Sequence, residues 1–295
     1  MKIGVLELGE YQFIKDLMQR FGGTEIEFIS VAEQRLPMAE KYKVILDRLS
    51  FQDPYLRQVM MLASLNGAYV INNPFASSMN NKIMHQKLIE TLGVKQPKTM
   101  VLPRVNEEWD LGGSVKEPNW DEVKKEISFP CIIKPFDGFA WDDVYTAATF
   151  RELQNLYNSM KYRCILLLQE KIEYTDYFRV FSINKRDVLI TKWNPKPFGL
   201  GEYMHPDQKQ METIGKKICD ATIKLNKMID FDVNAVEWCV DDDGELYIID
   251  AMNEVPDIVK NSMPEDFYWW IVEKFCQCIR EKFSSNEKNR RFFDQ

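Results

Sequence analysis

Short apolar runs alternate with amphipathic segments at the start of the chain. An apolar run bounded by turn residues predicts a buried strand, and apolar positions three and four apart predict a helix. This pattern predicts a strand at 2–8, a helix at 11–21, strands at 25–30 and 42–46, a helix at 54–66 and a strand at 68–72. Strands that alternate with helices are typical of a parallel sheet. We therefore expect a small doubly wound α/β lobe over residues 1–76.

The pattern changes after this lobe. A helix at 80–92 and a strand ending at 102 are followed mainly by strands, at 131–135, 144–148, 165–169, 178–184, 188–193, 234–240 and 245–251. Helices are predicted at 120–127, 150–160, 207–229 and 264–283, and the polar tail after Ser284 is expected to fray. The turn Asp241-Asp242-Asp243-Gly244 favours a hairpin. The predicted fold class is thus α/β and α+β, with two α+β lobes over residues 77–170 and 171–295.

Charge and cysteine content narrow the class of protein. The chain has 295 residues and a formal net charge of −7, whereas nucleic acids and anionic membranes favour basic partners. The N-terminal apolar run stops at Glu7, and no apolar stretch reaches the roughly 20 residues that cross a bilayer. The six cysteines have no spacing typical of disulfides or zinc sites. We expect a cytoplasmic protein with reduced thiols and neither a nucleic-acid nor a membrane partner.

Most of the usual catalytic motifs are missing. The sequence has two histidines, His85 and His205, and both are expected at the surface. It contains neither a Walker A motif nor the pattern G-x-G-x-x-G. A nucleotide site must therefore be built in another way, and three features of the sequence suggest one.

The first feature is Lys134, which follows the apolar run Cys131-Ile-Ile. A lysine that emerges from a buried strand is partly desolvated and favours an anionic partner such as a phosphate. The alternative is a side chain that extends from the strand end into solvent.

The second feature is a polar interruption between two apolar strands. The strand at 165–169 ends at Glu170-Lys171-Ile172, and the next strand begins after Asp176. Such a break exposes backbone N–H and C=O groups that can bind the edge of an adenine. Asp176 would then accept hydrogen bonds from ribose hydroxyls, and Arg179 would face phosphate. The alternative is a plain surface turn.

The third feature is a pair of acids within the predicted hairpin. Glu237 and Asp250 interrupt otherwise apolar strands, and Asn253 follows closely. On paired antiparallel strands the two acids can lie side by side, where they repel each other unless a cation lies between them. Two carboxylates and an amide are oxygen ligands that suit Mg²⁺.

In this order, the three features resemble the ATP-grasp superfamily, which includes glutathione synthetase, D-alanine–D-alanine ligase and the RimK-type amino-acid ligases. The segment 80–99, with Lys82, Gly93 and Pro97, is similar to the family's K…L…LG…P-x-T pattern. The resemblance covers nearly the whole chain and implies ATP and Mg²⁺ bound between the last two lobes. The nucleotide-binding residues that it implies are Lys82, Lys134, Gly138, Gln169, Glu170, Lys171, Ile172 and Asp176, and the implied metal ligands are Glu237, Asp250 and Asn253.

The chain departs from the family pattern in two places. The loop after Lys134 keeps one glycine, Gly138, beside aromatic residues that include Phe139 and Trp141. The metal segment reads Asp-Ala-Met-Asn, one residue longer than the family's Glu-x-Asn. The closing of a phosphate lid and the presence of a second metal site are therefore open.

The resemblance implies a carboxylate–amine ligase that acts through an acyl phosphate on small-molecule or amino-acid substrates. It makes Lys134 and Arg179 the expected catalytic charges, and a homodimer is compatible with it. The residues expected at the substrate are Asp47, Arg48, Lys192 and Asn194, and the alternative for each of them is a structural role. Two alternatives are a kinase on the same scaffold, which phosphorylates a hydroxyl, and a nucleotide-binding regulatory protein without catalysis.

Overall fold

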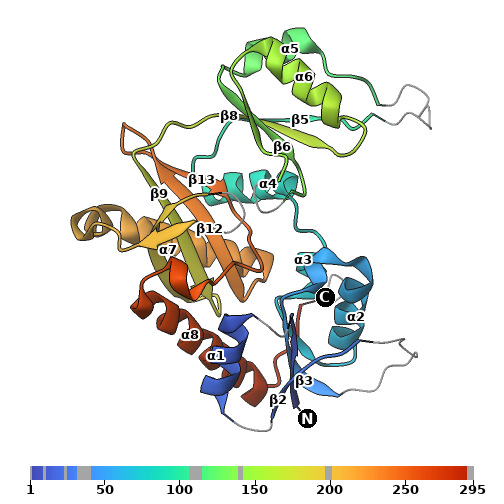
Figure 1. Ribbon diagram of the computed structural model, residues 1–295, viewed down its shortest axis with the longest axis vertical. Helices are drawn as coiled ribbons and strands as arrows, with labels where there is room; N and C mark the ends of the chain where they lie inside the picture. The colour runs from blue at the N-terminus through green and yellow to red at the C-terminus, as the bar shows by residue number, and fades with distance from the viewer. Residues whose placement is uncertain are drawn as a thin grey trace.

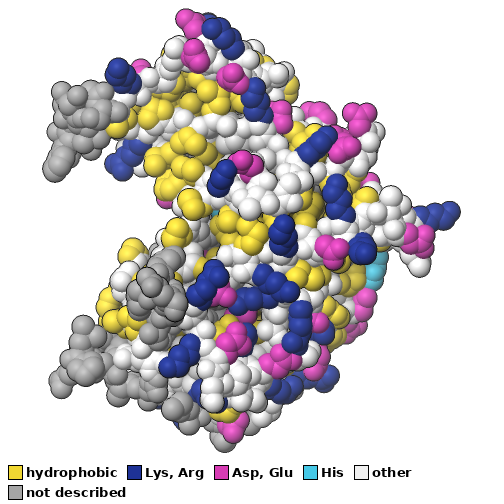
Figure 2. All heavy atoms as spheres, turned by 180° about the vertical axis from the view of Figure 1, so that it is seen from behind, with side chains coloured by type: hydrophobic (Ala, Val, Ile, Leu, Met, Phe, Trp, Pro, Cys, Tyr) yellow, Lys and Arg dark blue, Asp and Glu magenta, His cyan; other side chains and the backbone are white. Residues whose placement is uncertain are grey.

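The computed structural model describes residues 2–8, 11–22, 25–31, 41–105, 115–138, 142–196 and 201–290. Three sheets divide these residues into a first, a middle and a third lobe, and the middle lobe lies at the top of Figure 1. Figure 2 shows the molecule from behind, with a notch at one side between the middle lobe and the rest. The predicted α/β and α+β class is confirmed. Within the described ranges, no helix is both long enough and apolar enough to span a bilayer.

The first lobe is the parallel sheet that the alternating pattern predicts. Its strands are β1 (Lys2–Leu6), β2 (Ile26–Phe28), β3 (Tyr42–Asp47) and β4 (Tyr69–Ile71), in the order β2-β1-β3-β4. Its helices are α1 (Gln12–Phe21), η1 (Ser50–Gln52), α2 (Pro54–Leu65) and the short α3 (Pro74–Ser77), which the pattern did not predict. The helix α2 begins where expected because Pro54 fits the first helical turn and Asp53 accepts a hydrogen bond from the Leu56 amide at 2.9 Å.

The middle lobe is an antiparallel sheet with helices on one face. Its strands are β5 (Thr99–Leu102), β6 (Cys131–Pro135), β7 (Tyr145–Ala147) and β8 (Leu166–Glu170), in the order β5-β8-β6-β7. The helices α5 (Trp120–Glu126) and α6 (Phe150–Met160) pack through edge-to-face contacts of Trp120 with Phe150 and Tyr157. In Figure 1 both helices lie on the outer side of the sheet, which leaves the other face turned toward the rest of the molecule.

The third lobe is a five-stranded antiparallel sheet in the order β11-β10-β9-β12-β13. Its elements are β9 (Asp176–Ile183), β10 (Asp187–Asn194), the unpredicted β11 (Glu202–Met204), α7 (Gln208–Ile229), β12 (Val233–Val240) and β13 (Leu246–Asp250). Since successive residues of a strand face opposite sides, Phe178 and Val180 pack toward α7, whereas Tyr177 and Phe181 face away from it. The helix α4 (Lys82–Leu92) contacts both α7 and β13.

The last helix joins the third lobe to the first. After η3 (Lys260–Ser262), α8 (Glu265–Ser284) packs against α1 and β3. One hydrophobic cluster contains side chains of both lobes, such as Phe13 and Phe275, whose ring centroids are 5.0 Å apart. The first and third lobes therefore share a core, while the middle lobe has its own.

The prediction that the tail frays after Ser284 is wrong for residues 285–290. Asn289 is 2% exposed, and its amide accepts a hydrogen bond from Val70 N and donates one to Val70 O, both at 2.8 Å. Val70 lies on the edge strand β4, whose backbone groups need partners. The polar composition of the tail gave no sign of this contact, because its partner is 219 positions away in the sequence.

Candidate functional site

Lys82 and Lys134 reach the junction of the middle and third lobes from two different elements. Lys82 is the first residue of α4, which begins there because its N-cap, Asn81, accepts hydrogen bonds from two backbone amides of the first turn. The Lys82 ammonium donates a hydrogen bond to the Gly138 carbonyl at 2.8 Å and lies 3.2 Å from Asp250 Oδ2. Lys82 therefore links the predicted phosphate loop to the hairpin.

Lys134 lies at the buried end of β6, with 8% of the residue exposed. Burial, to which Lys82 adds, lowers the pKa of Lys134 to about 8, against the opposing effects of Asp250 and Glu237. Lys134 is thus a desolvated ammonium within the electrostatic reach of both hairpin acids, and its contact with phosphate stays a prediction. The lid residues Phe139 and Trp141 lie outside the described residues.

Glu237 and Asp250 are direct partners in the ladder between β12 and β13, beside a register shift that follows Glu237. Their predicted juxtaposition is confirmed. Burial raises the pKa of Glu237, and the charge of Asp250 adds to this rise. Burial also acts to raise the pKa of Asp250, but Lys82 and His85 hold it well below its usual range. A bound cation would relieve the repulsion within such a pair.

Arg179 and Asn253 lie beside the two acids. Arg179 on β9 is the ladder partner of Glu237, and its guanidinium lies 4.7 Å from the centroid of the Trp193 ring. The Asn253 side chain forms hydrogen bonds through both of its amide atoms when the nitrogen donates to the Val255 carbonyl and the oxygen accepts from Arg179. The backbone of Asn253 donates a hydrogen bond to the buried side chain of Asn234 at 2.8 Å. The Asp-Ala-Met-Asn segment is therefore held in place despite its extra residue.

His85 belongs to the same cluster of side chains, which comprises Lys82, Lys134, Arg179, Glu237 and Asp250. The prediction that His85 lies at the surface is therefore wrong. It is 3% exposed; its Nδ1 lies 3.3 Å from Asp250 Oδ1, and its Nε2 lies 2.8 Å from Asn80 Oδ1. Burial lowers the pKa of His85, although Asp250 opposes this. The local sequence could not reveal the contact, because α4 meets β13 only in the folded chain. His205 is exposed as predicted, 3.4 Å from Asp266.

The predicted adenine hinge lies where β8 ends. Gln169 is buried, and its amide donates a hydrogen bond to Thr99 Oγ1 at 2.8 Å. The Glu170 side chain accepts a hydrogen bond from a backbone amide next to β5 at 2.9 Å. Lys171 and Ile172 follow outside the strand. The side chains of Gln169 and Glu170 therefore hold the end of β8 to β5 and to the residue before it. Since these two side chains are already bound, an adenine at this hinge would be bound through backbone groups.

Asp176 and Lys192 form an ion pair of 2.5 Å, and Gln210 of α7 donates to the other oxygen of Asp176 at 2.9 Å. Burial acts to raise the pKa of Asp176, but Lys192 and Gln210 lower it below its usual value. Strand alternation puts Asp176 and Lys192 on the α7 side of the sheet, opposite to Arg179 and Glu237. The ribose role of Asp176 and the substrate role of Lys192 stay predictions that require this pair to open.

The other residues predicted at the substrate already have structural partners or lie at the surface. Asp47 accepts hydrogen bonds from two backbone amides in the turn after β3. Arg48 is 4% exposed, lies 3.0 Å from Glu7 Oε2 and donates to the Pro256 carbonyl at 3.1 Å. Asn194 is exposed at the end of β10. Arg48 ties the first lobe to the loop after Asn253, and substrate contact by these residues stays a prediction.

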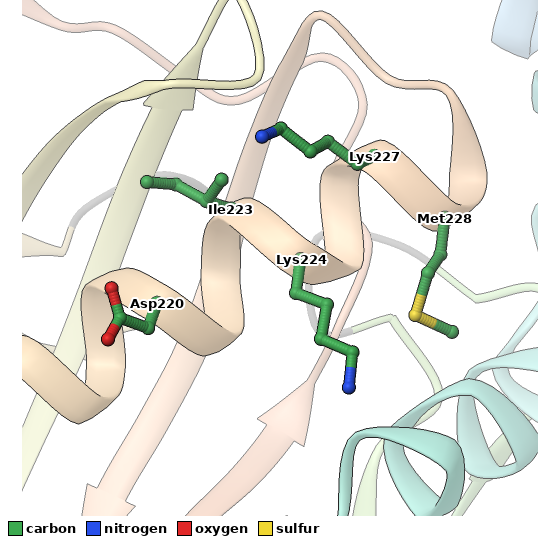
Figure 3. Close-up of a pocket in the computed structure, with 5 residues that line it drawn as sticks. All are labelled: Asp220, Ile223, Lys224, Lys227 and Met228. Atoms are coloured by element: carbon green, nitrogen blue, oxygen red, sulfur yellow. The ribbon is translucent and has the colours of Figure 1, made fainter.

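A hollow of about 430 Å³ lies away from this cluster, on α7. It is lined by Asp220, Ile223, Lys224, Lys227 and Met228, whose side chains in Figure 3 point in different directions and do not converge on one point. Nothing in its lining resembles a reactive group held in place. Its size therefore gives no reason to move the candidate site there.

A much smaller hollow, of about 10 Å³, lies at the cluster and is lined by Arg179, Trp193 and Tyr203 among others. Buried Arg179 Nε and Trp193 Nε1 both find no hydrogen-bond acceptor within the described ranges. Two such donors in a hollow of this size suit one small acceptor, such as a single water molecule. Trp193 was not predicted, yet the alternation along β10 contained the signal: Trp193 shares a face with Arg179, whereas the predicted Lys192 and Asn194 do not.

The donor set of Glu237, Asp250 and Asn253 fits a magnesium ion. Within the part of the chain that the structure describes, no group of three His, Cys, Asp or Glu side chains is arranged to hold a metal. Mg²⁺ does not need such a group, because it keeps several waters and is commonly bound by one or two carboxylates together with substrate phosphates. The site therefore suits a cation that arrives with a nucleotide.

No protein-family model matches the sequence, and no curated protein matches it at a significant level. Solved structures do match the fold. D-alanine–D-alanine ligase from Bacillus anthracis, complexed with ATP, has a TM-score of 0.69 at 15% identity, over 96% of this chain and 97% of that one. VanG D-Ala:D-Ser ligase from Enterococcus faecalis has a TM-score of 0.71 at 13% identity, over 96% and 99%.

A third similar structure is the ATP-grasp ligase PsnB, complexed with a minimal precursor, Mg and ADP. Its TM-score is 0.65 at 14% identity, and the match covers 96% of this chain and 98% of that one. All three likenesses extend over nearly the full length of both chains, so they concern the whole arrangement of lobes. The chain therefore has the ATP-grasp fold.

Proposed function

We propose that the chain is an ATP- and Mg²⁺-dependent ligase that joins a carboxylate to an amine through an acyl phosphate. The observation that carries the proposal is the convergence of Lys82, Lys134 and Arg179 on Glu237 and Asp250 in a chain of this fold. Proteins of the same fold are named as ligases and are complexed with ATP, or with Mg and ADP.

Electrostatics support a polyanionic ligand. The cluster has three cationic side chains and two acids, and one of the acids, Glu237, has a raised pKa because it is buried beside Asp250. A buried cation without a fixed anion is costly, and Lys134 accordingly has a pKa of about 8. A triphosphate with its magnesium ion would supply negative charge to Lys82, Lys134 and Arg179 and positive charge to the acids.

Each residue has a definite part in the proposed reaction. Lys82 and Lys134 bind the phosphates of ATP and neutralise charge that develops during transfer. A magnesium ion held by Glu237, Asp250 and Asn253 would supply further charge neutralisation. Arg179 stabilises the phosphoryl group as it reaches the substrate carboxylate, because its positive charge lies beside Glu237 and Asn253, two of the proposed metal ligands.

The chemistry has two steps. In the first, an oxygen of the substrate carboxylate forms a bond to the γ-phosphorus of ATP, and ADP leaves with the electron pair of the broken P–O bond. In the second, the amine nitrogen attacks the acyl carbon, a C–N bond forms, phosphate leaves and the nitrogen loses a proton. The protein contributes mainly the positions of the reactants and fixed charge.

The substrates belong to the class of amino acids, small peptides or related carboxylates. Structures with this fold include ligases named for D-alanine and the macrocyclase MdnC from Microcystis aeruginosa, bound with its precursor peptide MdnA. Both kinds of substrate present a carboxylate for activation.

The proposal is tested by trapping the acyl phosphate with hydroxylamine. The protein is incubated with ATP, Mg²⁺ and pools of amino acids and peptides, and hydroxamate and ADP are measured together. A ligase forms both in equal amounts, and each depends on the carboxylate pool. ADP formation without hydroxamate would instead indicate a kinase, and nucleotide binding without ADP formation a regulatory protein. Lys134→Met should form neither product. Its matched control is Lys216→Met, a change on the exposed face of α7, which should form both.

A further inference from the structure

The carboxylate of Glu237 is held by a tyrosine of the neighbouring strand. The Tyr177 hydroxyl donates a hydrogen bond to Glu237 Oε2 at 2.7 Å. A phenol keeps its proton near neutral pH and an ionised carboxylate only accepts, so the direction of this bond is fixed. Tyr177 is 6% exposed, and hydrogen bonds to ionised groups in such surroundings are strong. The hydroxyl therefore limits how the Glu237 carboxylate can turn.

Strand register explains why Tyr177 reaches this acid. Tyr177 and Arg179 lie two positions apart on β9, so both face the same side of the sheet as Glu237 on β12. Arg179 is the ladder partner of Glu237, and Tyr177 is the ladder partner of Cys239. The hydroxyl thus meets Glu237 diagonally, across a spacing that an aromatic side chain can span. Asp176, one position earlier on β9, faces the opposite side.

The ring of Tyr177 is itself fixed by packing. Its centroid lies 5.1 Å from that of Tyr174 and 5.7 Å from that of Trp193. The Trp193 ring also contacts the guanidinium of Arg179, 4.7 Å from its centroid. One indole therefore supports both the tyrosine that holds Glu237 and the arginine beside it.

The contact gives Glu237 a partner other than Arg179. The two residues have opposite charges and are ladder partners, yet Arg179 donates to the Asn253 side chain and Glu237 accepts from Tyr177. Without the hydroxyl, the Glu237 carboxylate would lose its donor, and the neighbouring guanidinium is a strong alternative. An ion pair between them would engage an acid and a cation that the proposed reaction both requires.

We propose that Tyr177 is a positioning residue that holds the Glu237 carboxylate ready for the cation of the nucleotide complex. This inference rests on the proposed function. It assigns Tyr177 no contact with nucleotide or substrate, and its effect passes through Glu237. Replacing the hydrogen-bond partner of a metal ligand commonly weakens metal binding by about tenfold to a hundredfold.

The test uses calorimetric titration of the whole chain with ADP at a series of Mg²⁺ concentrations, alongside thermal unfolding of the ligand-free protein. Tyr177→Phe removes the hydroxyl and keeps the ring contacts, so the variant is expected to fold. The matched control is Tyr268→Phe, because Tyr268 is also buried and its hydroxyl donates to Asp16 at the same 2.7 Å. Each variant loses one hydrogen bond to a carboxylate, but Asp16 on α1 is not a proposed metal ligand.

We expect Tyr177→Phe to raise the Mg²⁺ concentration needed for half-maximal ADP binding by about tenfold or more, with metal-free ADP binding unchanged. Tyr268→Phe should keep the Mg²⁺ dependence of the wild type, whatever its unfolding temperature. A purely structural role of Tyr177 predicts instead that both variants lose thermal stability and that neither changes the Mg²⁺ dependence.

Two results would overturn the inference and leave the proposed function standing. One is a Mg²⁺ dependence in Tyr177→Phe equal to that of the wild type. The other is an equal loss of ADP binding with and without Mg²⁺, which would mean that Tyr177 contacts the nucleotide itself. Wild-type protein that binds ADP without any effect of Mg²⁺ would instead remove the proposed function and this inference together.

Discussion

Replacing Lys134 with methionine separates the stability of the fold from the binding of phosphate. Lys134 is 8% exposed, and its pKa is lowered by burial to about 8 from an ordinary 10.5. At about 1.4 kcal/mol for each pKa unit, this difference corresponds to a cost of up to about 3 kcal/mol for keeping the ammonium charged in the fold. Methionine has a similar length and no charge. We therefore expect Lys134→Met to be more stable than the wild type near pH 7 by up to about 3 kcal/mol, and to lose ATP turnover.

The lowered pKa of Lys134 also determines how the free energy of unfolding changes with pH. Below pH 8 the Lys134 ammonium is protonated in both the folded and the unfolded chain, so its cost is fully present. Between about 8 and 10.5 the folded chain releases this proton while the unfolded chain keeps it, and the stability of the wild type rises with pH as a result. The advantage of the methionine variant should therefore shrink across this window and vanish above it.

Urea denaturation of the wild type and Lys134→Met, at about pH 7 and about pH 9.5, measures both free energies of unfolding. Lys216→Met, on the exposed face of α7, should change stability by less than about 0.5 kcal/mol at either pH. A methionine variant that is less stable than the wild type would refute the reasoning. So would a gap that is the same at both pH values, because it could not come from the charge of Lys134.

Three further substitutions test other parts of the structure. Asp250→Asn should reduce Mg²⁺-dependent ADP formation by about a hundredfold or more without unfolding the chain; full activity in a steady-state ADP assay would show that the metal assignment is wrong. Asn289→Ala leaves two backbone groups of Val70 without their partner, and should lower the free energy of unfolding by about 1–3 kcal/mol in urea denaturation; a loss below about 0.5 kcal/mol would mean that water replaces the amide. Gly201→Ala would bring its Cβ to 2.2 Å from Trp193 Nε1. Because the buried indole has to move, we expect kcat/KM to fall at least tenfold and the free energy of unfolding to fall by about 1–3 kcal/mol. Unaltered steady-state kinetics would exclude a role for the small hollow beside Arg179 and Trp193.

The local pattern of the chain contained most of its secondary structure. Strand alternation and helical periodicity depend on neighbours within a few residues, so the strands, the major helices and the hairpin could be predicted without knowledge of the fold. The same locality explains why the pairing of Glu237 with Asp250 was predictable. Both acids lie on strands joined by a tight turn, whose length limits how they can pair. The short elements α3 and β11 were missed because they contain too few residues to establish a period.

Contacts between distant segments were decided only by tertiary structure. His85 became buried because α4 meets β13, and Asn289 became part of the first lobe because α8 returns the chain to the edge of β4. For Arg48 the sequence left both substrate contact and a structural role open, and in the folded chain it is buried against the loop after Asn253.

The sequence by itself therefore determined which residue types are available and how each short segment folds. It also placed Glu237 opposite Asp250, since that pairing is local. The tertiary structure decided which of the cations meet those acids, and which polar side chains are already bound by partners elsewhere. The physical reason is that burial and electrostatic contact depend on distance in space, and hydrophobic packing of separate lobes sets those distances after the local elements have formed.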